Sequence, residues 1–126
     1  MQKGDTVVAK YECAIPNTYD FDTVLQYFHT HLFENADHVS FEQGSDLTSG
    51  PLRVAVRIYT KYYPIGKDWV GLHLTFATDG GETLVTGICA SSDRFGGPLA
   101  VRREKDFLNS FIDLANMFEG MCPIQK

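Results

Sequence analysis

The segment from residue 52 to residue 90 constrains the fold most, because apolar and polar residues alternate through two of its runs. The even positions are aliphatic or aromatic: Leu52, Val54, Val56 and Ile58, and then Val70, Leu72, Leu74 and Phe76. Residues of other kinds lie between them: Arg53, Arg57, Tyr59, Trp69, His73 and Thr75. A repeat of two is typical of strands with one buried face. We expect a sheet whose core face carries the even positions of both runs.

Two turn signals divide this segment into three strands of an antiparallel meander. Residues 63–68, Tyr-Pro-Ile-Gly-Lys-Asp, predict a loose hairpin loop, and Asp79-Gly-Gly81 predicts a tight turn. The second turn allows two registers. A three-residue loop pairs Phe76 with Leu84 and Leu72 with Ile88, and we favour it because it buries more apolar surface. A two-residue turn at Gly80 and Gly81 points a different set inward: Val85, Gly87 and Cys89.

The remaining elements follow from shorter patterns. Residues 6–13 alternate like a strand, and residues 38–43 like a second short strand, followed by a loop of turn formers over 44–51. Residues 20–33 and 104–119 carry apolar stripes at helical spacing, and Gly120 suits a helix end. Residues 91–98 read as a loop, and we leave open whether Leu99 to Arg102 forms an extra short edge strand. The stripes are Phe21, Val24, Leu25, Phe28 and Leu32, and Phe107, Leu108, Phe111, Leu114, Ala115 and Phe118.

This order of elements, β-α-β-β-β-β and then α, predicts an α+β fold with a single antiparallel sheet and both helices on one face. The helix-grip and TATA-box-binding-protein-like arrangements share the order, an analogy of architecture that carries no function. With 126 residues, we expect a single domain with residues 1–5 and 121–126 as tails.

Composition narrows the classes of partner. The chain has 11 Lys and Arg against 16 Asp and Glu, a net charge of −5, which disfavours nucleic acid and anionic membranes. No apolar run is long enough to span a bilayer, and no secretory signal is visible, so we expect a cytoplasmic protein. The three cysteines, Cys13, Cys89 and Cys122, form no C-x-x-C pair, which predicts reduced thiols, with the first two buried and the third exposed.

The segment from Phe41 to Tyr62, with Ala9-Lys-Tyr-Glu-Cys13 before it, resembles a family of small bacterial proteins catalogued only as a domain of unknown function. The most distinctive parts are the Gly-Ser-Asp-x-Thr-Ser-Gly loop and the Arg-x-Ala-Val-Arg strand. The resemblance covers residues 9–118, although residues 91–103 depart from the clearer strand expected there. It implies one compact domain, and it supplies no activity, cofactor or catalytic residue.

No motif indicates metal or nucleophilic chemistry. His29 and His31 lie two apart on a helix, where side chains diverge. His38 could complete a set with either of them, but solvated histidines at a helix end are the simpler interpretation, so we expect no metal and no cofactor. The Gly-Ser-Asp-Leu-Thr-Ser-Gly loop lacks the strand-to-helix context of a nucleophile elbow and the lysine of a phosphate loop. We interpret it as a structural turn.

The face of the sheet that points away from the helices is the candidate site. In either register considered for the first hairpin, Arg57, Tyr59 and His73 are neighbours, and three more residues extend the surface: Arg53, Trp69 and Thr75. This set suits a solvated face, a protein contact, or a site for a carboxylate or phosphate. No carboxylate lies in the alternation to orient His73 for acid–base work.

We therefore expect a non-enzymatic module that binds a protein partner or forms a homodimer through this face, with Trp69 largely exposed in the monomer. The alternative is a binder of a small apolar or anionic ligand in a cavity between the sheet and the C-terminal helix, and an enzyme is the third reading. Phenylalanines on the inward stripes could line that cavity, but a filled core is the simpler interpretation. They are Phe21, Phe28, Phe41, Phe76, Phe107, Phe111 and Phe118.

Overall fold

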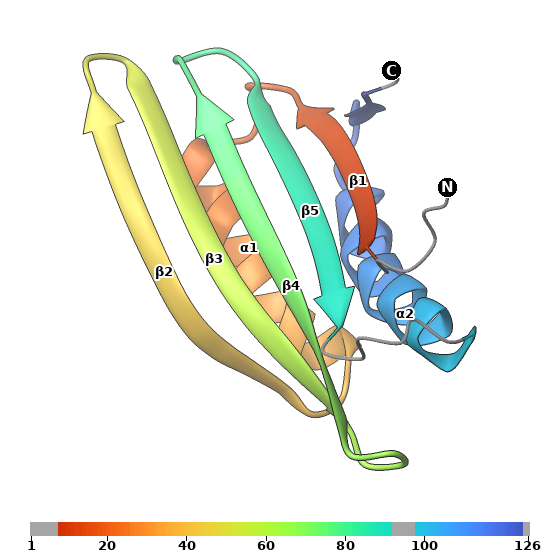
Figure 1. Ribbon diagram of the computed structural model, residues 1–126. Coiled ribbons are helices and arrows are strands. Elements are labelled where there is room, and N and C mark those ends of the chain that lie inside the picture. The colour runs from red at the N-terminus through yellow and green to blue at the C-terminus, as the bar shows by residue number, and fades with distance from the viewer. Residues whose placement is uncertain (1–7, 92–97, 125–126) are drawn as a thin grey trace, which may run out of the picture.

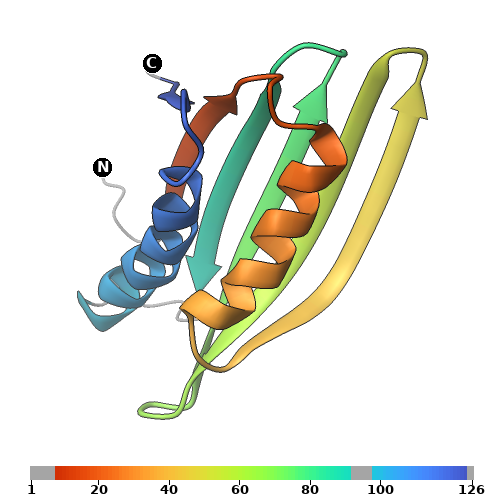
Figure 2. The same ribbon diagram turned by 180° about the vertical axis from the view of Figure 1, so that it is seen from behind.

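A computed structural model describes residues 8–91 and 98–124. Within these ranges the elements are β1 (Val8–Ile15), α1 (Phe21–Asn35), β2 (Val39–Ser49), β3 (Leu52–Tyr63), β4 (Asp68–Thr78), β5 (Thr83–Ser91), α2 (Pro98–Ala115) and β6 (Cys122–Pro123). The strands form one antiparallel sheet in the order β2-β3-β4-β5-β1-β6. Both helices cover the same face of it, so the predicted α+β class is confirmed (Figures 1 and 2).

Helix α1 carries the chain from β1 to the opposite edge of the sheet, where β2 begins (Figure 2). Asp20 caps its N-terminus, since a carboxylate oxygen accepts a hydrogen bond from the Thr23 amide at 3.4 Å. The helix buries its predicted stripe at Phe21, Val24, Phe28 and Leu32. Helix α2 packs on β5 and β1, and β2 lies at an edge with little helical cover.

Aromatic rings fill the space between the sheet and the helices. Phe28 of α1 contacts Phe76 of β4 and Phe111 of α2, with ring centroids 5.7 and 5.4 Å apart. Gly87 of β5 lies directly under Phe111, because a Cβ atom at that position would come within 2.5 Å of the ring. The predicted core role of Phe111 is therefore confirmed, and of the seven phenylalanines expected inside, Phe41 is the exception at 44% exposed.

The C-terminal region differs from prediction in two places. Helix α2 begins at Pro98, so residues 99–102 are helical and the extra edge strand is absent from the described residues. Within this added first part of the helix, the buried guanidinium of Arg103 pairs with Asp68 at 3.1 Å and donates to the Ile65 carbonyl of the β3–β4 loop. The segment expected as a tail contributes the two-residue strand β6, which pairs with β1. Most of the expected 91–98 loop lies outside the described residues.

Strand β2 is longer than predicted. It runs from Val39 to Ser49, so residues 44–49 are strand, and the turn comes at Gly50, whose φ is 55°. The expected structural loop over 44–51 is therefore wrong. Pairing with β3 explains the difference, because every residue from Gly44 to Ser49 has a partner there, and cross-strand contacts override weak strand propensity.

The second hairpin adopts the register that we did not favour. Phe76 pairs with Val85 and Leu72 with Cys89, across a turn at Gly80 and Gly81. Leu84 and Ile88 consequently face away from the helices. We favoured the other register because it buries more apolar surface within the hairpin. That prediction was wrong because the Phe111 ring occupies the space above Gly87, a contact that the sequence of the hairpin does not reveal.

Strand β3 presents to the helices the opposite set of residues from the predicted one. Tyr59 is fully buried, and its hydroxyl lies 2.9 Å from His29 Nδ1 of α1. Tyr59 pairs with the buried Leu72 of β4, and residues directly opposite in an antiparallel ladder share a face. The even positions of β4 are inward as predicted, whereas those of β3 face outward: Leu52, Val54, Val56 and Ile58.

The length of the first hairpin loop explains this inversion. Tyr63 pairs with Asp68, which leaves residues 64–67 in the loop, closed by positive φ angles at Gly66 (89°) and Lys67 (51°). An even number of loop residues pairs odd positions of one strand with even positions of the next. The expected arrangement required an odd number, so the loop decides which face of β3 is buried.

Candidate functional site

The outer face of the sheet, the one without helices, consists of rows of side chains that cross four strands. One row is Leu47, Val54, Ala77 and Leu84, and the next is Ser45, Val56, Thr75 and Thr86. The third is Gln43, Ile58, His73 and Ile88. Neighbours in a row lie close enough for their side chains to contact. The aliphatic residues of β3 thus lie in the middle of this surface. Val54 has apolar neighbours on both sides, whereas the neighbours of Val56 and Ile58 in their rows are polar.

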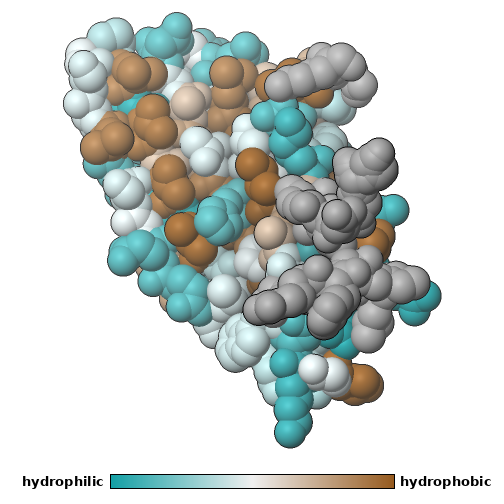
Figure 3. All heavy atoms as spheres, viewed as in Figure 1, coloured by the Kyte–Doolittle hydropathy of each residue, from teal (hydrophilic) through white to brown (hydrophobic). Residues whose placement is uncertain are grey.

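Six residues of these rows, together with Leu52 at the start of β3, form what we call the outer apolar patch: Leu47, Leu52, Val54, Val56, Ile58, Leu84 and Ile88. Leu47 is 68% exposed, Leu52 46%, Leu84 44% and Ile88 37%. Figure 3 shows apolar side chains gathered on this face, toward the end of the sheet where the β2–β3 and β4–β5 turns lie. A contiguous exposed apolar patch on a small domain marks an interaction surface more often than scattered single residues do.

Charged groups lie at the borders of this patch. Glu42, at the bulge of β2, accepts a hydrogen bond from the Thr60 hydroxyl at 2.6 Å. Glu12 of β1 accepts one from Thr86 at 3.1 Å. Among the three rows described above, His73 is the titratable residue, and it is exposed. The patch is therefore nearly neutral in a protein with a net charge of −5.

The structure separates the six predicted site residues into two groups. Trp69, His73 and Thr75 lie on the outer face, where Trp69 is 46% exposed and its ring centroid is 4.8 Å from that of Tyr62. The other three, Arg53, Arg57 and Tyr59, lie on the helix face, so their predicted place beside His73 is wrong. The residue opposite His73 is Ile58. The reason is the inversion of β3 described above.

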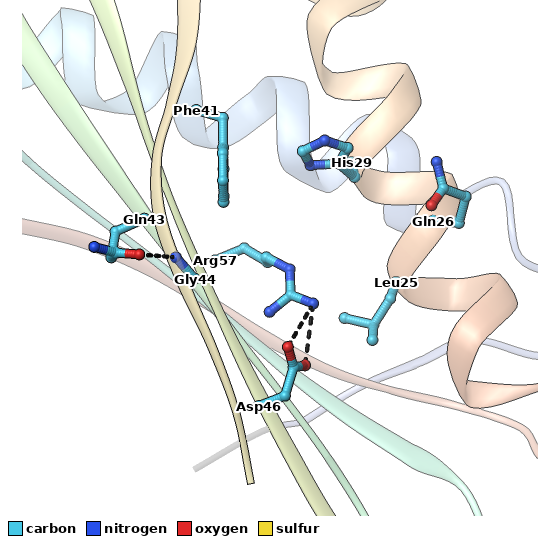
Figure 4. A pocket seen from close by; sticks show the side chains of 8 residues that line it. All are labelled: Leu25, Gln26, His29, Phe41, Gln43, Gly44, Asp46 and Arg57. Carbon is cyan, nitrogen blue, oxygen red and sulfur yellow. Dashed lines mark hydrogen bonds and ion pairs between the residues drawn. The ribbon is translucent and has the colours of Figure 1, made fainter.

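A polar groove lies on the helix face between α1, β2 and β3. Its volume is about 450 Å³, and its lining is Leu25, Gln26, His29, Phe41, Gln43, Gly44, Asp46 and Arg57. Arg57 lies across β2 and pairs with both carboxylate oxygens of Asp46, at 3.0 and 3.2 Å (Figure 4). The sequence brought attention to Arg57 but gave no sign that Asp46, in the segment expected to be a loop, is its partner.

Tyr59 lies next to this groove, and its ring contacts two lining residues, Phe41 and His29, with centroids 5.6 and 5.8 Å apart. Burial raises the pKa of its hydroxyl to about 12, so the group is neutral at physiological pH. It shares a hydrogen bond with His29 Nδ1, whereas His31 Nδ1 contacts Glu34 at 2.6 Å on the other side of α1. The two histidines therefore take different partners. Further along β3, Arg53 donates to both carboxylate oxygens of Asp22 in α1, at 2.8 and 3.3 Å, and this bond lowers the pKa of Asp22.

The cysteines lie where predicted, with Cys13 and Cys89 buried and Cys122 exposed. Burial raises the pKa of the Cys13 thiol to about 11, and it raises that of Cys89 further, with a smaller contribution from the buried carboxyl of Glu104. Reactive cysteines have lowered pKa values, so neither buried thiol has the environment of a nucleophile.

Sequence reasoning placed no member of the outer apolar patch on the outer face. It assigned the even positions of β3, Leu52, Val54, Val56 and Ile58, to the core, and it also missed Leu47, Leu84 and Ile88. Leu47 lay in the expected loop, and the other two were assigned to the core by the favoured register. A signal was available for Leu84 and Ile88, because the two-residue Gly80-Gly81 turn turns them outward. For Leu47 the signal would have been its pairing with Val54, which is not visible in the sequence of β2 alone.

Comparison with known proteins gives a family but no chemistry. The model of a family of unknown function, DUF6054, matches residues 8–119. No curated protein matches the chain significantly. No solved structure does so either. Within the described residues, neither helix has the length and apolar character that crossing a membrane requires.

Proposed function

The chain belongs to the DUF6054 family of unknown function, and we propose that this domain is an interaction module that pairs with a second copy of itself through the outer apolar patch. The observation that carries the proposal is the inversion of β3. Four aliphatic residues of β3 point to the outer face, where Leu52 is exposed and Val54, Val56 and Ile58 are partly exposed. Exposed aliphatic side chains lie on β2 beside them, at Leu47, and on β5 beyond β4, at Leu84 and Ile88. In the monomer these aliphatic side chains stay partly in contact with water, whereas a second apolar surface would remove them from it.

A second copy is the occupant that the electrostatics favour. Two copies carry the same net charge of −5 and repel each other, but their nearly neutral patches meet without placing like charges opposite each other. A two-fold axis through the patch makes each row of one copy face a row of the other, as in packed sheets about 10 Å apart. Salt screens the long-range repulsion, so association should strengthen as ionic strength rises.

The area available is sufficient for a weak dimer. From Leu52 to Tyr62 the outer face runs about 33 Å, and the strands from β2 to β1 span about 19 Å, which gives roughly 600 Å² per copy. Specific interfaces bury about 600–1,000 Å² per partner, so this face lies at the lower end of that range. Trp69 and Tyr62 lie at one end of the face and add aromatic area of the kind that interfaces favour.

The observed packing does not favour a ligand cavity between the sheet and α2. Phe107 and Phe111 are fully buried there, and the close approach of Phe111 to Gly87 leaves no room for a methyl group at that position. The packing supports the interpretation of those rings as a filled core.

Sedimentation velocity across a dilution series tests the proposal. We expect a monomer–dimer equilibrium that Leu47→Lys and Ile88→Lys each shift to monomer, because a lysine would have to be buried without a partner. The matched control is Met117→Lys, a change of the same kind at a residue that is 71% exposed beyond α2. It should leave the equilibrium unchanged.

Two results would contradict the proposal. One is a wild-type protein that stays monomeric at every concentration and ionic strength. The other is a dimer that survives both patch variants, because its interface would then lie elsewhere. The melting temperature of each variant at low concentration verifies that the monomer remains folded.

A further inference from the structure

The groove between α1, β2 and β3 lies on the opposite side of the sheet from the outer apolar patch, and its lining is suited to a different kind of partner. Figure 4 shows Phe41 from β2, Arg57 from β3, and Leu25 and His29 from α1 pointing toward one common space, while Gln43 points away from it. We propose that this groove binds a small aromatic monocarboxylate. The ligand carboxylate takes the place of Asp46 on Arg57, and the ring lies against Phe41 and Leu25.

Arg57 is held ready for such a ligand by the backbone. Its Nη1 donates to the carbonyl of Val56 at 2.9 Å and to that of Ser45 at 3.4 Å. Its stem crosses β2 at Gly44, where a Cβ atom would lie 3.2 Å from Arg57 Cδ. The remaining amino group, Nη2, points at Asp46. A guanidinium fixed in this way presents donors in a geometry that matches a carboxylate, at little entropic cost.

Asp46 occupies the position that a ligand carboxylate would take. Its side chain is 60% exposed, whereas that of Arg57 is 19% exposed. Asp46 can therefore turn into water, while Arg57 remains in the groove and needs an anionic partner. Because the Asp46 carboxylate is mostly in water, its pairing with Arg57 contributes little, so an incoming carboxylate that adds ring contacts can displace it.

The walls of the groove select an aromatic body over an inorganic anion. The Phe41 ring is 44% exposed, and the His29 ring stands against it edge to face with centroids 5.3 Å apart. Leu25 adds an aliphatic surface on the α1 side. The lining contains one guanidinium, which balances a single negative charge, whereas a phosphate dianion commonly requires further donors or cations. A monocarboxylate with a flat apolar ring matches both features.

The test uses benzoate and its neutral analogue benzamide as probes in an amide NMR titration of the whole chain. We expect benzoate to shift the Gly44 and Arg57 signals and benzamide to bind several-fold more weakly. Asp46→Asn should tighten benzoate binding by up to about fivefold, since it removes the competing carboxylate. Arg57→Gln should abolish binding. The control is Arg53→Gln, because Arg53 lies on the same face of β3 with a carboxylate partner but does not line the groove.

Three results would overturn the proposal. The first is equal binding of benzoate and benzamide, and the second is weaker benzoate binding by Asp46→Asn than by the wild type. The third is that neither wild type nor Asp46→Asn shows a shift at Gly44 with 20 mM benzoate, roughly the weakest affinity expected for so small a ligand. The Asp46→Asn variant should remain folded, because the substitution changes an exposed side chain and leaves the backbone contacts of Arg57 intact. The proposal stands apart from self-association, whose patch variants lie on the other face.

Discussion

Strands β3 and β4 carry the same alternation of aliphatic and polar residues, yet β4 buries its aliphatic set and β3 exposes its own. In β4 the even positions Leu72 and Leu74 are fully buried. In β3 the even positions point to the outer side, where they are exposed or partly exposed, and Tyr59 is buried instead. The difference teaches that alternation identifies a strand without deciding which face it buries, because the connecting loop sets the register.

The helices can accept the polar set of β3 because they supply matching partners. Asp22 of α1 accepts two hydrogen bonds from Arg53, whose guanidinium also lies 4.5 Å from the centre of the Phe21 ring. His29 shares a hydrogen bond with Tyr59. A polar group that is buried with a partner costs little compared with one left unpaired. At β3, the side of the sheet that packs on the helices is therefore mixed polar and aromatic, and the outer side is aliphatic.

The largest expected effect comes from a matched pair of leucines, one on each strand. Leu74→Ala in β4 should lower the free energy of unfolding by about 2–5 kcal/mol, because it leaves a cavity in the core. Leu52→Ala in β3 should cost less than about 1 kcal/mol in the monomer, since that side chain is already 46% exposed. Chemical denaturation at low protein concentration measures both. Equal losses would show that β3 is not inverted.

Alanine substitutions at two glycines, one on each face of the sheet, compare the packing of the two faces directly. Gly87→Ala should destabilise the protein by about 1–3 kcal/mol, because the new methyl group would press on the Phe111 ring. Gly71→Ala, on the outer face of β4, meets its nearest atom at 3.8 Å and should change stability by no more than about 0.5 kcal/mol. Thermal unfolding of the two variants distinguishes them. A tolerated Gly87→Ala would mean that α2 does not pack as described.

The pH dependence of stability tests whether Tyr59 is buried on the helix side of β3, and Tyr59→Phe is the variant for this test. At neutral pH it should cost about 0.5–1.5 kcal/mol, the value of a hydrogen bond. The folded pKa of Tyr59, about 12, lies above the unfolded value, about 10. The unfolded chain therefore loses this proton first, so the contribution of Tyr59 to stability is constant below pH ~10 and falls as pH rises toward 12. Tyr59→Phe should flatten this fall, and Tyr62→Phe on the outer face should not. Identical alkaline profiles for wild type and Tyr59→Phe would contradict burial of Tyr59.

The smallest expected effect concerns the ion pair between α1 and β3. Asp22→Asn should reduce stability by less than Tyr59→Phe does, because both partners are largely exposed. The bond to Arg53 lowers the pKa of Asp22, so its contribution is present above the unfolded pKa and is lost as pH falls through the folded one. Urea unfolding at low and high salt measures it. A loss that grows with added salt would contradict an electrostatic origin.

Much of the fold could be predicted from residue patterns. The stripes of α1 and α2, the alternation of β1 and β4, and the burial of Cys13 all follow from local sequence and hold in the structure. The length of β2 could not be predicted, because turn formers such as Gly44 and Ser45 are held in the strand by pairing with β3. The contacts of Arg103 in α2 with the distant β3–β4 loop could not be predicted either, because they join segments far apart in the sequence.

The candidate site was half predictable. Sequence patterns placed Trp69 and His73 correctly on the outer face, and that face remains the proposed contact surface. They could not place Arg57 or Tyr59, because one residue more or less in the first hairpin loop moves every side chain of β3 to the other face. The loop sequence at residues 63–68 is compatible with several lengths. The partners Asp46 and His29 come from segments whose proximity only the folded sheet creates.

Methyl NMR with a soluble paramagnetic agent, recorded across a dilution series, tests the central claim most directly. The agent speeds the relaxation of exposed methyl groups, so it reports which face of each strand meets solvent. We predict that the methyl groups of Val54, Val56 and Ile58 relax fast in the dilute monomer and more slowly as concentration rises, while those of Val70, Leu72 and Leu74 stay slow throughout. Equally slow relaxation of both sets in the dilute monomer would contradict the inversion of β3, and fast relaxation of the β3 set at every concentration would contradict self-association through the outer apolar patch.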